Sequence, residues 1–188
     1  MASLERTKPG TTAVIVVDVQ EKLIPTLPEA RVDDIRRSAR ILLGAARELE
    51  SPVLWCEQYP RGLGPTDEAV ATELRECDVK PLEKLTFSAA MDPGFNEAWA
   101  ASGADAAVVL GIEAHICVFQ TVRDLLERGV RVDVVIDGVA SRRDDHRQTG
   151  LRLCERAGAN LTTSETVLFE WLVEAGTDRF KRLSRLVR

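Results

Sequence analysis

Short apolar runs alternate along this chain with longer segments in which apolar residues recur every three or four positions. Residues 12–17 form an apolar run rich in β-branched side chains, which is typical of a buried strand. The spacing over 29–49 instead predicts an amphipathic helix. By the same criteria, further strands are expected at 53–56, 105–110, 130–136 and 160–162, and further helices at 118–126, 145–157 and in the C-terminal region.

The alternation of strands and helices predicts a parallel sheet with helices on both faces. No repeat, low-complexity tract or Pro/Gly/Ser-rich linker interrupts it. We therefore expect an α/β fold, a three-layer doubly wound sandwich around a mainly parallel sheet of about six strands. It should form a single domain over 1–188, with a flexible N-terminus at 1–10. Two stretches, about 57–66 and 81–93, are expected to be irregular loops that help to build a site.

Composition narrows the class of protein. Of 188 residues, 45% are hydrophobic and 29% charged, which are ordinary globular values. The net charge of -5 argues against nucleic acid as a partner. No apolar run is long enough to span a membrane, and the first residues lack a signal-peptide core. With four cysteines and no Cys-x-x-Cys pair, free thiols in the cytoplasm are expected.

The candidate chemistry begins with Cys117, which follows an apolar strand and Gly111, where the next helix is expected to start. A helix N-terminus stabilises negative charge, so a thiol there can be a thiolate near neutral pH. Asp18 directly follows the first strand. Ligands of open parallel sheets bind at the carboxyl ends of the strands, where the winding reverses. If the strands before Asp18 and Cys117 are neighbours, the two side chains face each other across that crevice.

Lys84 completes a plausible set of reacting groups. Asp18 can take the thiol proton, while Lys84 orients Asp18 and favours the thiolate. Backbone N–H groups of Glu113 and Cys117 would offer an oxyanion hole. Taken singly, each residue also has an ordinary structural role: a carboxylate after a strand caps a turn, a loop lysine is solvated, and a lone cysteine packs as a small hydrophobe.

Three segments resemble the isochorismatase-like cysteine hydrolases. Residues 14–20 match the family's first strand with its Asp-x-Gln ending, Lys84 followed by 87–89 matches its catalytic-lysine segment, and 111–118 match its nucleophile segment. Their order and spacing agree over nearly the whole chain. Residues 57–64 and Thr163-Ser164-Glu165 look like the subgroup called isochorismatase domain-containing proteins.

The resemblance implies a catalytic triad of Asp18, Lys84 and Cys117, and a cis peptide between Ile112 and Glu113. It implies nucleophilic acyl transfer, in which the thiolate attacks an amide-type carbonyl, an amine or ammonia leaves, and water hydrolyses the thioester. It also suggests a homo-oligomer, a dimer or larger. The loop after the second strand has no histidine, so no nicotinamidase-type metal and no cofactor are expected.

Four further side chains are candidates for the substrate pocket: Gln20, Gln58, Tyr59 and Phe87. Gln20 could brace the site loop through its amide or serve a plain turn, and Phe87 could equally lie in the core. His115 is expected to hydrogen-bond locally or to face a subunit interface, because side chains two apart at a helix start do not face each other well.

Two charged segments have simple interpretations. Residues 142–147 are expected to be a solvated helix start. Residues 179–188 form a basic, amphipathic segment that is expected to pack on its own domain or on a sister subunit and not on a membrane.

The sequence thus predicts a hydrolase that acts on a small molecule with an amide-type C–N bond. Two alternatives stay open: a non-catalytic binding or thiol-sensing protein on the same fold, and a hydrolase that cleaves a vinyl ether. A phosphoacceptor site on Asp18 is disfavoured, because Gln20 stands where haloacid-type enzymes place a second aspartate.

Overall fold

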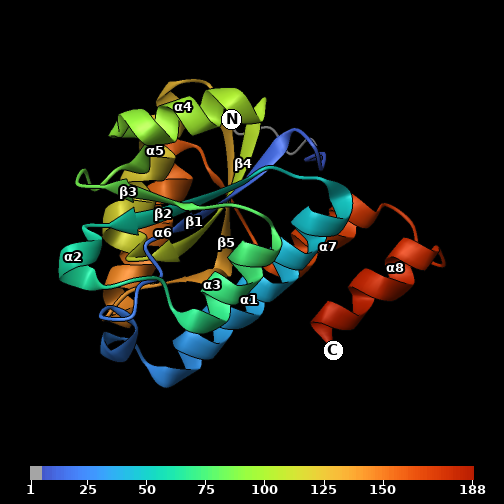
Figure 1. Cartoon of the computed structure of the whole chain (residues 1–188), viewed down its shortest axis with the longest axis horizontal. Coiled ribbons are helices and arrows are strands. Elements are labelled where there is room, and N and C mark those ends of the chain that lie inside the picture. Colours follow the sequence, from blue (N-terminus) through green and yellow to red (C-terminus); the bar gives the residue numbers. More distant parts are fainter. Residues whose placement is uncertain (1–5) are drawn as a thin grey trace.

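The computed structural model describes residues 6–188. A sheet lies at its centre, with the strand order β3-β2-β1-β4-β5-β6 and every neighbouring pair parallel (Figure 1). The strands are β1 (Thr12–Val17), β2 (Val53–Gln58), β3 (Pro81–Lys84), β4 (Ala106–Ile112), β5 (Arg131–Ala140) and β6 (Asn160–Thr162). The chain winds outward from β1 to β3 and then returns to the other side of β1 at β4. The expected doubly wound α/β class is confirmed.

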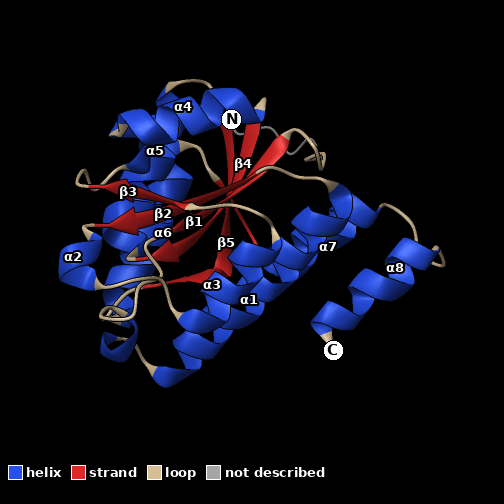
Figure 2. Ribbon diagram, viewed as in Figure 1, coloured by secondary structure: helices blue, strands red, loops and turns tan. Residues whose placement is uncertain are grey.

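Helices cover both faces of the sheet, as Figure 2 shows. One layer contains α1 (Glu29–Leu49), α3 (Glu68–Glu76), α7 (Ser164–Leu172) and α8 (Asp178–Leu183). The other contains α4 (Pro93–Ser102), α5 (Phe119–Glu127) and α6 (Asp144–Ala157), and the short α2 (Pro60–Leu63) follows β2. Alternate residues of β1 pack into the two layers, with Val14 on the α1 side and Ile15 on the α5 side. A strand covered on both faces is apolar throughout, which explains the continuous apolar run.

Several elements differ from the sequence-based expectation. The stretch 81–93, expected to be irregular, contains β3 and a 3₁₀ turn at Ala89–Met91, and the stretch 57–66 contains the end of β2 and α2. β5 continues to Ala140, and α3 and α4 were not anticipated. The reason is clearest at β3, which is a short edge strand with polar, exposed positions and therefore has no apolar run to reveal it.

Residues near both ends of the chain pack against the rest of the protein. Of the N-terminal segment expected to be flexible, residues 1–5 lie outside the described residues, whereas Thr7 is buried and accepts a hydrogen bond from Trp171 Nε1 at 3.0 Å. At the other end, Leu183 is buried in the α1 layer and Leu186 lies against Gly44 of α1. The expectation that this basic segment packs on its own domain is confirmed. Among residues 6–188, no helix has the length and apolarity needed to cross a membrane.

Candidate active site

The three candidate catalytic residues meet at the carboxyl ends of β1, β3 and β4. Asp18 follows β1, Lys84 ends β3, and Cys117 lies in a π-helical turn (Ala114–Val118) that follows β4. β1 and β4 are hydrogen-bonded neighbours, with Val17 opposite Gly111. A Cβ at Gly111, whose φ is +138°, would collide with the Val17 carbonyl, so only glycine allows this close approach. The crevice therefore forms at the reversal of winding, as the topology argument requires.

Lys84 and Asp18 form a buried ion pair. Lys84 Nζ lies 2.8 Å from Asp18 Oδ2, and the two side chains are 1% and 0% exposed. The same ammonium donates to Gln58 Oε1 at 2.8 Å and lies 3.2 Å from the carbonyl oxygens of Thr86 and Phe87. Burying an ammonium group is costly unless hydrogen bonds replace its contacts with water, and these four oxygen atoms do so. These partners hold the Lys84 ammonium in place, and the ammonium in turn holds Asp18 Oδ2.

The second oxygen of Asp18 is left for Cys117. Asp18 Oδ1 is buried and has no hydrogen-bond partner among residues 6–188, and Asp18 and Cys117 line the same cavity. Burial raises the pKa of Asp18, although the charge of Lys84 opposes this. Burial and then the negative charge of Asp18 raise the pKa of the Cys117 thiol. Both shifts favour the protonated form of their group, so the thiolate expected from a helix N-terminus is not what this environment favours.

Two glutamines connect the site to its supporting loop. Gln20 Nε2 donates to the carbonyls of Gln58 at 3.0 Å and Gly64 at 2.6 Å, and its Oε1 accepts from the Gln58 N–H at 2.9 Å. Gln58 in turn accepts from Lys84 and donates from Nε2 to the Leu85 carbonyl. Gln20 thus braces the loop, as one sequence interpretation had it, but it is fully buried and does not line the cavity.

The site opens into a cavity of about 190 Å³. Its lining combines reactive, polar and apolar side chains: Asp18, Leu23, Gln58, Leu63, Phe87, Ile112, Glu113, Ile116, Cys117 and Arg142. Phe87 is 56% exposed at this cavity, so its alternative assignment to the core is wrong. Tyr59 is 52% exposed and lines a neighbouring hollow with Leu85, apart from Cys117.

Arg142 is a cavity residue that the sequence analysis missed. Its Nε and Nη2 donate to Glu113 Oε1 and Oε2 at 3.0 and 3.1 Å, and its backbone N–H donates to Oε1 at 3.1 Å. Burial alone would raise the pKa of Glu113, but these hydrogen bonds and the Arg142 charge bring that pKa below its usual value. The expectation of a solvated helix start is met, since residues 142–146 are exposed and α6 begins at Asp144. What the sequence analysis missed is that Arg142 follows β5 and so ends at the same edge of the sheet as the site. The peptide between Ile112 and Glu113 is cis, as the resemblance implied.

Comparison with known proteins places this arrangement in a family. The Isochorismatase domain matches residues 12–166. The chain belongs to the isochorismatase family. It is 36% identical over 187 residues to human isochorismatase domain-containing protein 2, covering 99% of this chain and 87% of that protein. This confirms the subgroup and places the chain among isochorismatase-like hydrolases.

Solved structures agree with the assignment to the isochorismatase family. MAR1 ribonuclease from Caenorhabditis elegans is 34% identical, with a TM-score of 0.87 over 97% of this chain and 92% of that one. YcaC from Escherichia coli, described as an octameric hydrolase of unknown specificity, has a TM-score of 0.88 over 99% of this chain and 92% of that one. At 20% identity, the second likeness shows the fold alone.

In this isochorismatase-family protein, His115 does not pair with Cys117 in a catalytic dyad. His115 Nδ1 lies 3.0 Å from Ser141 Oγ, and its ring centroid is 4.7 Å from that of His146. This confirms a local hydrogen bond for His115. Within residues 6–188, no group of three or more His, Cys, Asp or Glu side chains is arranged to hold a metal ion.

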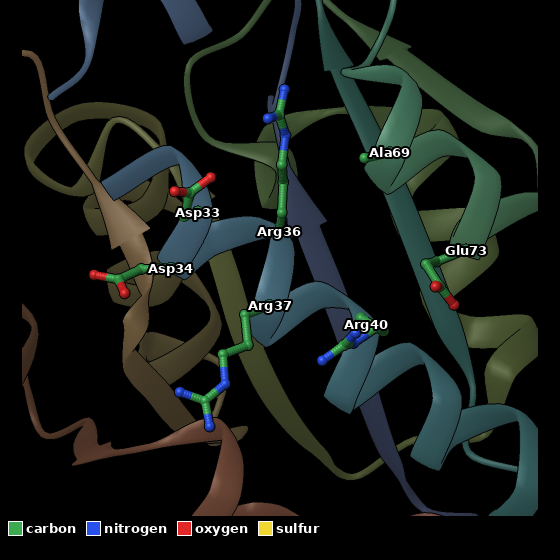
Figure 3. A pocket seen from close by; sticks show the side chains of 7 residues that line it. All are labelled: Asp33, Asp34, Arg36, Arg37, Arg40, Ala69 and Glu73. Atoms are coloured by element: carbon green, nitrogen blue, oxygen red, sulfur yellow. The ribbon is translucent and has the colours of Figure 1, made fainter. Parts of the chain in front are cut away.

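A larger hollow lies away from the site, between α1 and α3 (Figure 3). Its arginines are already engaged. Arg36 binds Asp67 through two hydrogen bonds, Arg37 donates to the Val187 carbonyl, and Arg40 donates to the Leu186 carbonyl. These contacts hold the C-terminal turn and α3 to α1, which gives the arginines a structural role.

Replacing Gly150 of α6 with alanine should disturb the segment that carries Cys117. A Cβ at Gly150 would lie 2.5 Å from the carbonyl carbon of Ala114 and 2.6 Å from the His115 nitrogen, both backbone atoms of the π-helical turn. Because backbone cannot swing aside, we expect the free energy of unfolding to fall by about 1–3 kcal/mol, measured by urea denaturation. Gln148→Ala, on an exposed part of the same helix, is the control and should change it by less than about 0.5 kcal/mol. Equal stability of the two variants would contradict the close contact.

Proposed function

We propose that this protein is a cysteine-dependent hydrolase that cleaves a small amide-type substrate through a thioester. The observation that carries the proposal is the convergence, in one cavity, of a thiol with the free oxygen of a carboxylate that a buried lysine holds in place. A nucleophile, its base and a group that orients the base are the minimum set for such chemistry.

The first half-reaction follows from the positions of these groups. As Cys117 Sγ attacks the carbonyl carbon, Asp18 Oδ1 takes the thiol proton, and the carbonyl π electrons move to oxygen. The backbone N–H groups of Glu113 and Cys117 are the proposed oxyanion hole. When the tetrahedral intermediate collapses, the C–N bond breaks and the proton passes from Asp18 to the leaving nitrogen.

In the second half-reaction, water hydrolyses the thioester and Asp18 again acts as the base. Asp18 removes a proton from a water molecule as the water oxygen attacks the thioester carbon. The C–S bond then breaks, the carboxylic acid product leaves, and Cys117 recovers its proton. Lys84 keeps its hydrogen bond to Oδ2 throughout, so Oδ1 stays directed at the thiol. General-base catalysis by Asp18 thus serves both steps, on the thiol in the first and on water in the second.

The size of the cavity favours a small substrate. Its volume of about 190 Å³ is below the range of about 300–1,000 Å³ found for drug-sized ligands. The name ribonuclease belongs to the relative from Caenorhabditis elegans. For this chain, the small cavity and the net charge of -5 favour a small molecule over a polynucleotide.

Two measurements test the proposed function without a known substrate. The first is the iodoacetamide alkylation rate at each cysteine by peptide mapping, and the second is ammonia release from a panel of small primary amides. We expect alkylation of Cys117 to exceed that of Cys56 and Cys154, because Cys117 lines the cavity whereas the other two thiols are buried outside it. An inert Cys117 together with no ammonia release would sink the proposal. Alkylation without turnover would favour the thiol-sensing alternative, and a ketone or enol product without ammonia would favour vinyl-ether cleavage.

Replacing Asp18 with asparagine should lower the hydrolysis rate by about 10²–10⁴-fold, because the amide cannot accept the thiol proton. The readout is kcat/KM for any amide hydrolysed by the wild type, with Asp92→Asn, which alters the cap of α4, as the control. The wild-type rate should also fall as pH is lowered through the Asp18 pKa, which burial raises above its ordinary value. A variant rate within tenfold of wild type would remove Asp18 from the mechanism.

The proposal extends to assembly and setting. We infer a single-domain, cytoplasmic enzyme that works without metal or cofactor and assembles as a homo-oligomer, with no nucleic acid or membrane partner. Free thiols at all four cysteines support the reducing compartment. Octameric YcaC and four exposed apolar side chains support self-association: Tyr59, Leu85, Phe87 and Met91. Sedimentation velocity of the full chain tests the oligomer.

A further inference from the structure

Arg142 has donors to spare at the cavity. Its Nε and one N–H of Nη2 are used by the Glu113 carboxylate, yet no acceptor binds Nη1 within the described residues 6–188. A guanidinium presents two edges for bidentate bonding, and Glu113 occupies the edge formed by Nε and Nη2. The edge formed by Nη1 and Nη2 is therefore open. Arg142 lines the cavity, and its side chain is 59% exposed.

The other polar side chains that line the cavity have their hydrogen-bonding groups already engaged or assigned to catalysis. Gln58 is engaged through both ends of its amide, by Lys84 and by the Leu85 carbonyl. Both oxygens of Glu113 accept from Arg142. Asp18 is held by Lys84, and its remaining oxygen is the base in the proposed mechanism. Arg142 thus provides the uncommitted charged donors of the lining, and the remaining walls are apolar: Leu23, Leu63, Phe87, Ile112 and Ile116.

We propose that Arg142 is a specificity-determining residue that binds a carboxylate of the substrate, so that the substrate class is a small amide that also carries a carboxylate. This inference rests on the proposed function, since it describes a second group of the molecule whose amide meets Cys117.

The ion pair with Glu113 supports this role in two ways. It holds the guanidinium in one plane, so less side-chain entropy is lost when the open edge binds a planar, bidentate anion. It also limits the net positive charge of the site. A monoanionic carboxylate suits that balance better than a phosphate dianion, which the neighbouring Glu113 would repel.

Two alkylating agents of nearly equal size provide a direct test at Cys117. Iodoacetate carries a carboxylate, and iodoacetamide carries the neutral amide. The quantity measured is the ratio of their rate constants at Cys117, divided by the same ratio for N-acetylcysteine. We expect this normalised preference to favour iodoacetate by about fivefold or more in the wild type, as one nearby positive charge allows.

Variants assign the preference to Arg142. Arg142→Gln should lower it by about fivefold or more. Because that change leaves Glu113 without its partner, the double variant Glu113→Gln/Arg142→Gln is the second measurement, and it should lose the preference too. Arg143→Gln is the matched control, since Arg143 is bonded to Asp145 and does not line the cavity. Its preference should stay within about twofold of wild type.

The possible failures are distinguishable. A wild-type preference no greater than that of N-acetylcysteine, or equal losses in Arg142→Gln and Arg143→Gln, would overturn the carboxylate site while leaving the nucleophile standing. A double variant that keeps the wild-type preference would also overturn it. If iodoacetamide does not alkylate Cys117 at all, the proposed function fails first and the inference fails with it.

Discussion

Hydrolysis should fall by about 10⁴-fold or more when Cys117 is replaced by alanine. The thioester cannot form without the thiol, and neither Asp18 nor Lys84 is placed to attack a carbonyl, because both are held in a buried ion pair. Serine at position 117 should be almost as inactive, since Asp18 would have to deprotonate a far less acidic hydroxyl. The measurement is ammonia release under single-turnover conditions, which separates loss of chemistry from slow product release.

The matched control for this prediction is Cys154→Ala. Cys154 is a buried thiol on α6, outside the cavity, and burial raises its pKa to about 12. Its replacement creates a small void but removes no reacting group, so the rate should remain near wild type. Circular dichroism should show both variants folded. A Cys117→Ala enzyme that retains more than about one hundredth of the wild-type rate would point to a nucleophile other than this thiol.

The second large effect is on stability. Lys84→Met should lower the free energy of unfolding by about 3–5 kcal/mol, because it leaves the Asp18 carboxylate buried without its cation. Lys22→Met, which removes an exposed lysine bonded to the Gly62 carbonyl, is the control and should change it by less than about 0.5 kcal/mol. Urea denaturation at neutral pH measures both.

Two further results would identify the cause of that loss. Without Lys84, the pKa of Asp18 in the folded protein rises further above its unfolded value. Ionisation of Asp18 then opposes folding at neutral pH, and the penalty shrinks as pH falls below the raised pKa of the folded protein and is lost below the pKa of the unfolded chain. The defect of Lys84→Met should therefore shrink on acidification. The double variant Asp18→Asn/Lys84→Met should be more stable than Lys84→Met alone, and the same deficit in both at every pH would refute the uncompensated charge.

Much of the layered fold could be predicted from local pattern. β1 and α1 begin and end where the apolar spacing places them, at Thr12–Val17 and Glu29–Leu49. β1 is buried throughout and α1 is buried along one face, so each side-chain pattern reports its environment directly. β3 and α4 were not predicted, and for β3 the reason is that its side-chain pattern does not reveal a strand. β3 is a polar edge strand that pairs only with β2, and its pairing depends on a strand distant in sequence.

Some residues of the candidate site were likewise predicted from the sequence, and others were not. Asp18, Lys84 and Cys117 were identified because each lies in a recognisable segment and because topology brings the ends of parallel strands together. Arg142 was missed, although it follows β5 and ends at the same edge. Its neighbours 143–147 are strongly charged and obscured that position. Tyr59 was included by sequence adjacency to Gln58, and the chain turns at this residue, where φ is +38°, into a separate hollow.

The sequence by itself determined the class of fold and the order of the reactive segments, because these depend on periodicity and spacing along one chain, and three of its motifs carried the resemblance to the family. Only the tertiary structure decided the direction in which the Cys117 pKa shifts, the ion pair of Arg142 with Glu113, and which candidates reach the cavity. These properties arise from burial and from charges that approach from distant segments. A helix start taken alone favours a thiolate, whereas the folded site places a buried carboxylate beside that thiol and reverses the preference.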